Sequence, residues 1–87
     1  MLSHDYNVIK GNIIKENTES GISLGYTCGN TITKNHIFEN NVGIRVYSSF
    51  DNVMSENNFI NNTINTLDFG ENEWNMNYYD TWIGLGY

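Results

Sequence analysis

Several residue types are scarce or missing in this chain, and each absence excludes a class of structure. The 87 residues include no proline and no alanine, and the single cysteine, Cys28, rules out an internal disulfide. No Cys/His cluster has the spacing of a zinc site. No apolar run approaches the roughly 18 residues of a membrane span, and no signal-peptide pattern precedes the first repeat. We therefore expect one small domain whose core has no crosslink, and no membrane insertion.

Basic residues are also few. Four lysines and arginines stand against ten aspartates and glutamates, so the formal net charge is −6. A polyanion would be repelled by such a surface. Neither nucleic acid nor an anionic membrane is expected as a partner.

Asparagine is abundant, and its spacing forms a repeat. Groups of the form Asn-x-Ile follow one another about five residues apart, which does not fit the 3.6-residue stripe of an amphipathic helix. Very short strands separated by bends fit this spacing, and a repeat of 20 to 23 residues is typical of a stacked coil. The corresponding asparagines form three series: Asn7, Asn30, Asn52 and Asn72; Asn12, Asn35, Asn57 and Asn77; and Asn17, Asn40 and Asn62.

Stacking gives the asparagines a physical role. Rungs of a parallel coil lie about 4.8 Å apart. At that distance each amide can donate to the same amide on one neighbouring rung and accept from the other. The three series therefore predict three asparagine ladders. We place each asparagine at a corner, where its own backbone would adopt the left-handed αL conformation that asparagine tolerates.

The residues between the asparagines predict which side chains face the core. Alternation along a strand puts Ile towards the inside and its neighbours towards the outside. The expected inward columns are Ile9, Ile32, Met54 and Trp74; Ile14, Ile37, Phe59 and Tyr79; Ile22, Ile44 and Ile64; and Leu24, Val46 and Leu67. The expected outward columns are Val8, Thr31, Val53 and Glu73; and Ile13, His36, Asn58 and Tyr78.

The two ends of the chain differ in composition. Residues 72–87 contain both tryptophans, Trp74 and Trp82, and bulky aromatics would cover the bare end of a coil. We therefore divide a single domain, 1–87, into repeat rungs at 1–71 and an aromatic C-terminal cap at 72–87. The N-terminal end starts in the middle of a repeat, as a fragment of a longer coil would. This open rung predicts self-association or continuation into further rungs.

The repeat as a whole is similar to a known family. Asn-x-Ile-x-x-Asn-x-Ile-x-x-Asn, followed by Gly-Ile-x-Leu, resembles the PbH1 repeats of NosD-like and carbohydrate-binding and sugar hydrolase (CASH) proteins. The segment 77–85 resembles the Asn-Tyr-Trp-Asp-x-Trp-Ile-Gly sequence that ends such repeats, with Tyr79 in place of Trp. The resemblance implies an all-β fold, a right-handed parallel β-helix of about three rungs. It also implies an extracellular or cell-surface location.

Chemistry is harder to find than architecture. Polysaccharide-cleaving β-helices place converging carboxylates on one exposed sheet face, but Asp51 and Asp68 fall near bends, where turn chemistry explains them. We assign no catalytic residue and no cofactor. The NosD name raises copper, whose available ligands are His4, Cys28, His36, Met54 and Met76. The repeat places them apart, so we assign no metal site.

The nearest candidate for recognition is Arg45 with Tyr47 and Tyr26. Aromatic faces and a guanidinium on a flat sheet could stack on a sugar and hydrogen-bond to it. The same residues also suit ordinary exposed strand positions. The sequence thus predicts a non-catalytic structural or binding module, with carbohydrate as its candidate ligand. Two alternatives remain: a fragment of a polysaccharide lyase or hydrolase without its catalytic rungs, and a module that stacks end to end.

Overall fold

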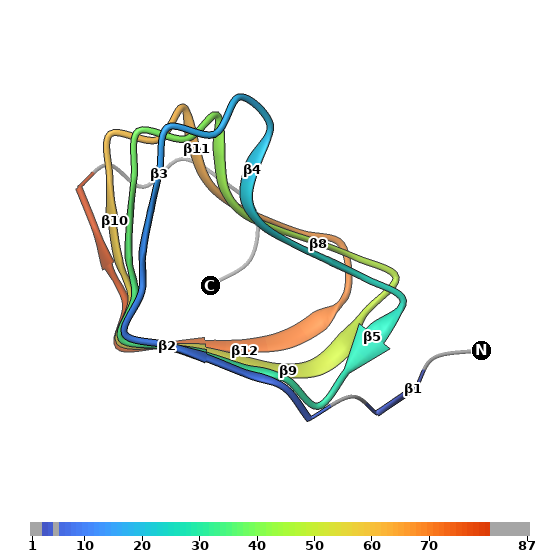
Figure 1. The fold of residues 1–87 in the computed structure, drawn as a ribbon. Coiled ribbons are helices and arrows are strands. Elements are labelled where there is room, and N and C mark those ends of the chain that lie inside the picture. Colours follow the sequence, from blue (N-terminus) through green and yellow to red (C-terminus); the bar gives the residue numbers. More distant parts are fainter. Residues whose placement is uncertain (1–2, 5, 81–87) are drawn as a thin grey trace.

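The computed structural model describes residues 3–4 and 6–80, and these form a parallel β-solenoid of about three turns. Viewed along its axis, the chain traces the same polygonal path on each turn, so that successive turns lie directly over one another (Figure 1). The described residues contain no helix, and therefore none that could cross a membrane. The predicted fold is confirmed.

Three parallel sheets form the sides of the coil. The first contains β1 (Ser3–His4), β2 (Val8–Lys10), β5 (Thr27–Cys28), β6 (Thr31–Thr33), β9 (Phe50–Ser55) and β12 (Glu71–Asn75). The second contains β3 (Ile13–Lys15), β7 (His36–Phe38), β10 (Asn58–Ile60) and β13 (Tyr78–Tyr79). The third contains β4 (Ser20–Gly25), β8 (Val42–Tyr47) and β11 (Ile64–Asp68).

The three asparagine ladders are present. In the first ladder the backbone N–H and the Nδ2 of Asn30 both donate to Oδ1 of Asn52, each at 2.9 Å. Asn35 makes the same two bonds to Asn57, each at 3.0 Å. Because Asn30, Asn35 and Asn52 are buried, these bonds satisfy polar groups that water does not reach. The ladders run through every residue predicted for them, and Asn77 is the fourth member of its series.

The corners differ from the prediction in one respect. The αL residue is the one before each ladder asparagine, not the asparagine itself. With the exception of Asn72, every ladder asparagine follows a residue of positive φ, from 51° at Tyr6 to 80° at Gly29. The turn is made one residue early because the asparagine must already be extended to direct its amide to the next rung. The outward-facing corner position can then hold exposed residues such as Glu16 or Lys34.

Two of the predicted inward columns are confirmed. Ile9 pairs with Ile32, Ile32 with Met54 and Met54 with Trp74. In the second sheet, Phe59 lies between Ile37 and Tyr79 and stacks on the Tyr79 ring, with centroids 5.1 Å apart and planes at 8°. Ile32, Ile37, Met54 and Phe59 are fully buried at 0% exposure, so this part of the core is closed.

For the third sheet, the prediction of the inward columns was wrong at the last member of each column. Thr66, not Ile64, pairs with Ile44, and Asp68, not Leu67, pairs with Val46. The prediction followed apolar residues, whereas the bond from Asn40 to Asn62 sets a 22-residue register that continues into β11. Ile64 and Leu67 are half-buried, while Thr66 is fully buried. The register is thus set by the ladder rather than by hydrophobicity.

Residues 72–79, placed in the predicted cap, continue the coil. Strand β12 pairs in parallel with β9, and β13 with β10. Trp74 and Tyr79 accordingly occupy inward columns above Met54 and Phe59. The other aromatic cap residues, Trp82 and Tyr87, lie outside the described residues.

Candidate functional site

The three residues proposed for recognition come together on the outside of one corner. Tyr26 lies between β4 and β5, whereas Arg45 and Tyr47 lie one rung further, at the end of β8. The Tyr26 and Tyr47 rings meet edge to face, with centroids 5.6 Å apart and an 88° interplanar angle. The Arg45 guanidinium carbon lies 5.4 Å from the centroid of the Tyr47 ring. We call Tyr26, Arg45 and Tyr47 the corner patch.

A glycine sets the position of the Tyr47 ring. Gly25 pairs with Tyr47 in the neighbouring strand, and the ring lies over the Gly25 backbone. A Cβ atom at position 25 would overlap the Cζ, Oη and Cε2 atoms of Tyr47. The absent side chain therefore lets the ring lie down against the sheet towards Tyr26, which is itself 64% exposed.

The next rung is shortened at this same corner. The ladder spacing falls from 22 residues between Asn30 and Asn52 to 20 residues between Asn52 and Asn72. Asp68 still keeps register with Val46, and Glu73 pairs with Val53 through a register shift, so the lost residues fall between Asp68 and Glu73. The shorter turn leaves part of the preceding rung uncovered.

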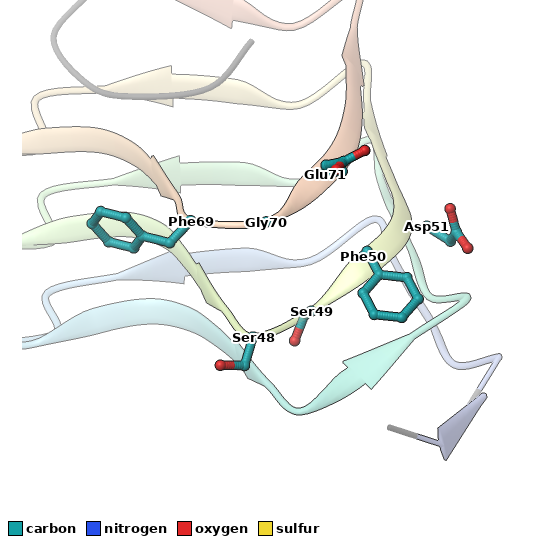
Figure 2. A pocket seen from close by; sticks show the side chains of 7 residues that line it. All are labelled: Ser48, Ser49, Phe50, Asp51, Phe69, Gly70 and Glu71. Atoms are coloured by element: carbon teal, nitrogen blue, oxygen red, sulfur yellow. The ribbon is translucent and has the colours of Figure 1, made fainter. Parts of the chain in front are cut away.

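A groove of about 540 Å³ opens where the turn is short. Figure 2 shows Phe69 and Phe50 on opposite sides of the groove, with Ser48, Ser49 and Gly70 between them. Phe69 is 61% exposed and Phe50 41% exposed, so both rings present apolar surface to solvent. The remaining lining residues, Asp51 and Glu71, add carboxylates to the rim.

Gly70 forms the floor of the groove for a steric reason. A Cβ atom at this position would overlap the carbonyl oxygen of Ser49, so no other residue fits without moving the backbone. The Gly70 N–H donates to Oδ1 of Asp68 at 2.8 Å. Glycine therefore both permits the tight turn and leaves the groove unfilled.

The groove continues the corner patch along the coil. The Phe69 N–H donates to the Val46 carbonyl at 3.0 Å, and Phe69 directly follows Asp68, the partner of Val46. Phe69 thus holds on its rung the position that Tyr47 holds on the rung before. Aromatic rings from successive rungs, about 4.8 Å apart in a parallel coil, line one edge of the molecule.

Phe50 and Phe69 are site residues that the sequence did not predict. The sequence does contain a sign of the groove, because the spacing of the ladder asparagines drops by two residues in the rung where a glycine follows Asp68 and Phe69. A shortened repeat beside a glycine indicates a depression in an otherwise regular coil. Only the register shows that the depression adjoins Tyr47.

The two aspartates near the groove, Asp68 and Asp51, play different structural roles. Asp68 is tied into the turn, since its Oδ1 accepts from the Asn72 amide and its Oδ2 from the Trp74 indole N–H. This agrees with turn chemistry for Asp68. Asp51 precedes a ladder asparagine and has a φ of 60°, which makes it a corner residue as well as part of the groove rim.

The soft and imidazole groups considered as metal ligands do not gather at one place, although His4 pairs in register with Cys28 on the neighbouring strand, where the sequence predicted them apart. Cys28 is buried at 1% exposure, Met54 lies in the core at 0%, and Met76 is 82% exposed. His36 faces outward, with its Nδ1 3.1 Å from Nδ2 of Asn58 and its ring edge to face with Phe38. Within residues 3–4 and 6–80, no group of three His, Cys, Asp or Glu side chains is placed to hold one metal ion.

Comparison with known proteins identifies the family. No curated protein and no solved structure matches the chain significantly. The family model described as "Periplasmic copper-binding protein (NosD)" matches residues 1–84, which is nearly the whole sequence. With its parallel solenoid and asparagine ladders, the chain belongs to the NosD family.

Proposed function

We propose that this chain is a non-catalytic binding module whose ligand is a carbohydrate held at the corner patch. The observation that carries the proposal is the contact of Tyr47 with both Tyr26, at 5.6 Å, and Arg45, at 5.4 Å. Rings held in this way offer rigid apolar faces to the C–H side of a sugar ring, while the guanidinium offers several donors to its hydroxyls. The groove beside Phe69 gives the patch the depth that a flat sheet lacks.

The geometry favours binding over cleavage. Glycoside cleavage uses two carboxyl groups on either side of the scissile bond. The corner patch pairs aromatic rings with an arginine and holds no carboxylate. Of the carboxylates nearby, Asp68 is engaged by Trp74 and Asn72, and Asp51 and Glu71 lie on the rim of the adjoining groove. The alternative, a fragment of a polysaccharide-active enzyme, predicts that the chain releases reducing ends from a polysaccharide that it binds.

Copper fits the described residues poorly. The family description names copper, and soft ligands from Cys or Met with imidazole would be the expected donors. Cys28 and Met54 are enclosed, and His36 uses Nδ1 towards Asn58 on the outer face. These groups would need the coil to open before they could share one ion, so we do not propose copper as the ligand of this chain.

The location that we propose is outside the cytoplasm, at the cell surface or in the surrounding space. The family description "periplasmic" supports this placement. A surface location would also bring the module to polysaccharides. Fractionation of cells that produce the protein, with detection in the cytosolic fraction alone, would refute it.

A glycan array followed by titration calorimetry tests the proposed ligand class. We expect the chain to bind one or more oligosaccharides, and the Arg45→Ala, Tyr47→Ala double variant to lose at least about tenfold in affinity, or about 1.4 kcal/mol. The matched control is Lys15→Ala, Phe38→Ala, because Lys15 lies 5.7 Å from the Phe38 centroid on another sheet. The control should bind as the unchanged protein does.

Two outcomes would overturn the proposal. If no glycan binds, carbohydrate is the wrong ligand class. If both double variants lose binding equally, the corner patch is not the site. Release of reducing ends from a bound polysaccharide would replace the binding module with the enzyme alternative.

A further inference from the structure

One asparagine of the chain begins a motif that the coil does not require. Asn61, Asn62 and Thr63 have the form Asn-x-Thr, the acceptor pattern for N-linked glycosylation, in which x is any residue except proline. Among all the asparagines of the chain, Asn61 alone has a serine or threonine two residues later. The motif lies at the corner between β10 and β11, on the surface of the coil, where such acceptors occur.

The repeat itself keeps this motif away from most ladder asparagines. In the first two ladders, the second residue after each asparagine packs in the core or against it, as Phe59 does after Asn57. A serine or threonine at that place would bring a hydroxyl into the core. Asn61 instead stands one residue before the ladder asparagine Asn62, so the residue that completes its motif, Thr63, falls at an exposed position.

The side chain of Asn61 is available for modification. Asn61 is exposed and has a φ of 55°, the left-handed conformation that asparagine tolerates. Its backbone N–H donates to Oδ2 of Asp80 at 2.7 Å, a contact that does not use the side chain. Within residues 3–4 and 6–80, neither the Asn61 amide nor the Thr63 hydroxyl takes part in a hydrogen bond. A sugar joined to Asn61 Nδ2 therefore displaces no hydrogen bond of the coil.

The middle residue of the motif has the opposite environment. Nδ2 of Asn62 donates to the Ile37 carbonyl at 3.0 Å and to Oδ1 of Asn65 at 3.1 Å. Oδ1 of Asn62 accepts from the backbone N–H of Asn40 at 2.9 Å and from its Nδ2 at 3.0 Å. A substituent on Asn62 Nδ2 would break at least one of these bonds. Of the two adjacent amides, only that of Asn61 can carry a large group in the folded protein.

A glycan at this corner leaves the corner patch open. The motif directly precedes β11, whereas the corner patch lies at the end of β8, and these two strands are neighbours in the third sheet. The two corners therefore lie at opposite ends of that sheet (Figure 1). On the other rungs the same corner holds Glu16 and Glu39, which are exposed and have φ values of 60° and 59°. The position thus directs side chains away from the core.

We propose that Asn61 is a site of N-linked glycosylation, with an oligosaccharide joined to its Nδ2. The inference rests on the proposed location outside the cytoplasm. The donor is a lipid-linked oligosaccharide phosphate, and the catalyst is a transferase of the cell that produces the protein. Nδ2 attacks the anomeric carbon of the first sugar, the bond from this carbon to the phosphate oxygen breaks, and a C–N bond forms. The amide releases one proton, and the lipid phosphate leaves with the electron pair.

Mass spectrometry of the protein from cells that produce it naturally tests the site. Cleavage after glutamate releases residues 57–71 as one peptide, which contains the whole motif. We expect the mass of this peptide to be raised by whole sugar units, and fragmentation to place the added mass on Asn61. Asn61→Gln and Thr63→Ala should each abolish the addition, whereas Thr63→Ser should retain it, because serine also completes the motif. The control Asn75→Gln, at an exposed asparagine outside the motif, should leave it unchanged.

The site and the location would fail in different ways. An unmodified 57–71 peptide from protein recovered outside the cytoplasm would overturn the glycosylation site and leave the proposed location standing. Protein found in the cytosol alone, without sugar, would overturn both. Sugar that persists in Thr63→Ala, or that fragmentation places on Asn62, would also overturn the proposal, because the motif would then not direct the transfer to Asn61.

Discussion

Asp68 accepts a hydrogen bond from the indole N–H of Trp74 at 2.7 Å, and this contact closes the shortened corner of the coil. The other carboxylate oxygen accepts from the Gly70 N–H and the Asn72 amide, each at 2.8 Å. One side chain thus organises the turn, the last ladder member of the first sheet and the final core aromatic. An acidic residue occupies the inward column here because three donors converge on it.

Replacing Asp68 tests this role. In Asp68→Ala the Trp74, Gly70 and Asn72 donors lose their acceptor. The Gly70 N–H is exposed to water and the Asn72 amide still donates to the Ser49 carbonyl, but the indole N–H of the buried Trp74 is left unsatisfied, which costs about 1–3 kcal/mol. We expect a loss of stability of about that size and a red shift of tryptophan fluorescence. Urea denaturation measures the loss. Glu71→Ala removes an equal charge from an exposed position of the same rung and should change stability little. Equal effects would contradict the role of Asp68.

The ladders predict that Asn35 and Asn75 contribute differently to the stability of the protein. Asn35 is 2% exposed and joins Asn12 to Asn57, whereas Asn75 is exposed and lies outside the ladders. Asn35→Ala removes the acceptor of the Asn12 donors and the side-chain donor to the Ile9 carbonyl, and leaves the Asn57 Oδ1 with only the backbone N–H of residue 35, which should lower stability by about 1–3 kcal/mol. Asn75→Ala should lower it by much less. Thermal unfolding of both variants measures the difference, and similar melting temperatures would count against the ladder.

Gly25 offers a way to disturb the corner patch without removing any of its members. In Gly25→Ala the new methyl group overlaps the Tyr47 ring, which must swing away from Tyr26. Because the ring is a partly buried surface group, we expect little loss of stability but weaker glycan binding, by about tenfold or more. Thr18→Ala, at an exposed position outside the corner patch, is the control. Undiminished binding in Gly25→Ala would show that the ring position does not matter.

Tyr79 predicts how stability changes at high pH. Burial raises the pKa of the Tyr79 hydroxyl from 10.0 to about 12, against a smaller lowering by a hydrogen bond from Asn77. Below pH 10 the group is protonated in both the folded and the unfolded state. Between pH 10 and about pH 12 only the unfolded state releases the proton, so the free energy of unfolding falls over that window.

Comparing Tyr79→Phe with the unchanged protein isolates this contribution. The variant should lose less stability than the unchanged protein as the pH rises from 10 to about 12. Urea midpoints measured across this range provide the test. Parallel curves for the two proteins would show that Tyr79 ionises as easily in the folded state as in the unfolded chain.

Most of the fold follows from the asparagine spacing. Because each ladder bond joins identical residues, the numbering of Asn30, Asn35 and Asn40 alone fixes the register of the neighbouring strands. Hydrophobicity was the weaker guide. It selected Ile64 and Leu67 for the core, whereas the ladder register places Thr66 and Asp68 there, and the partners of Asp68 lie in a turn that no pattern predicts.

The candidate site was only half visible in the sequence. Arg45, Tyr47 and Tyr26 could be grouped because the repeat places Gly25 and Tyr47 on adjacent rungs. Phe50 and Phe69 could not be grouped, since the groove between them depends on where inside the turn the missing residues fall. That position is decided by how closely Gly70 approaches the Ser49 carbonyl, which is a property of the folded backbone.

Every ladder bond joins residues 20 to 23 positions apart, and this spacing governs how the protein can fold. The chain must close a loop of one whole rung before it gains its first bond of this kind, and the entropy of closing the loop is lost beforehand. No short segment of the chain is therefore stable before a second rung has formed. With about three turns in total, the smallest productive nucleus, two rungs in register, already includes most of the molecule. Folding should therefore be all-or-none, and slower than that of a helical protein of equal length.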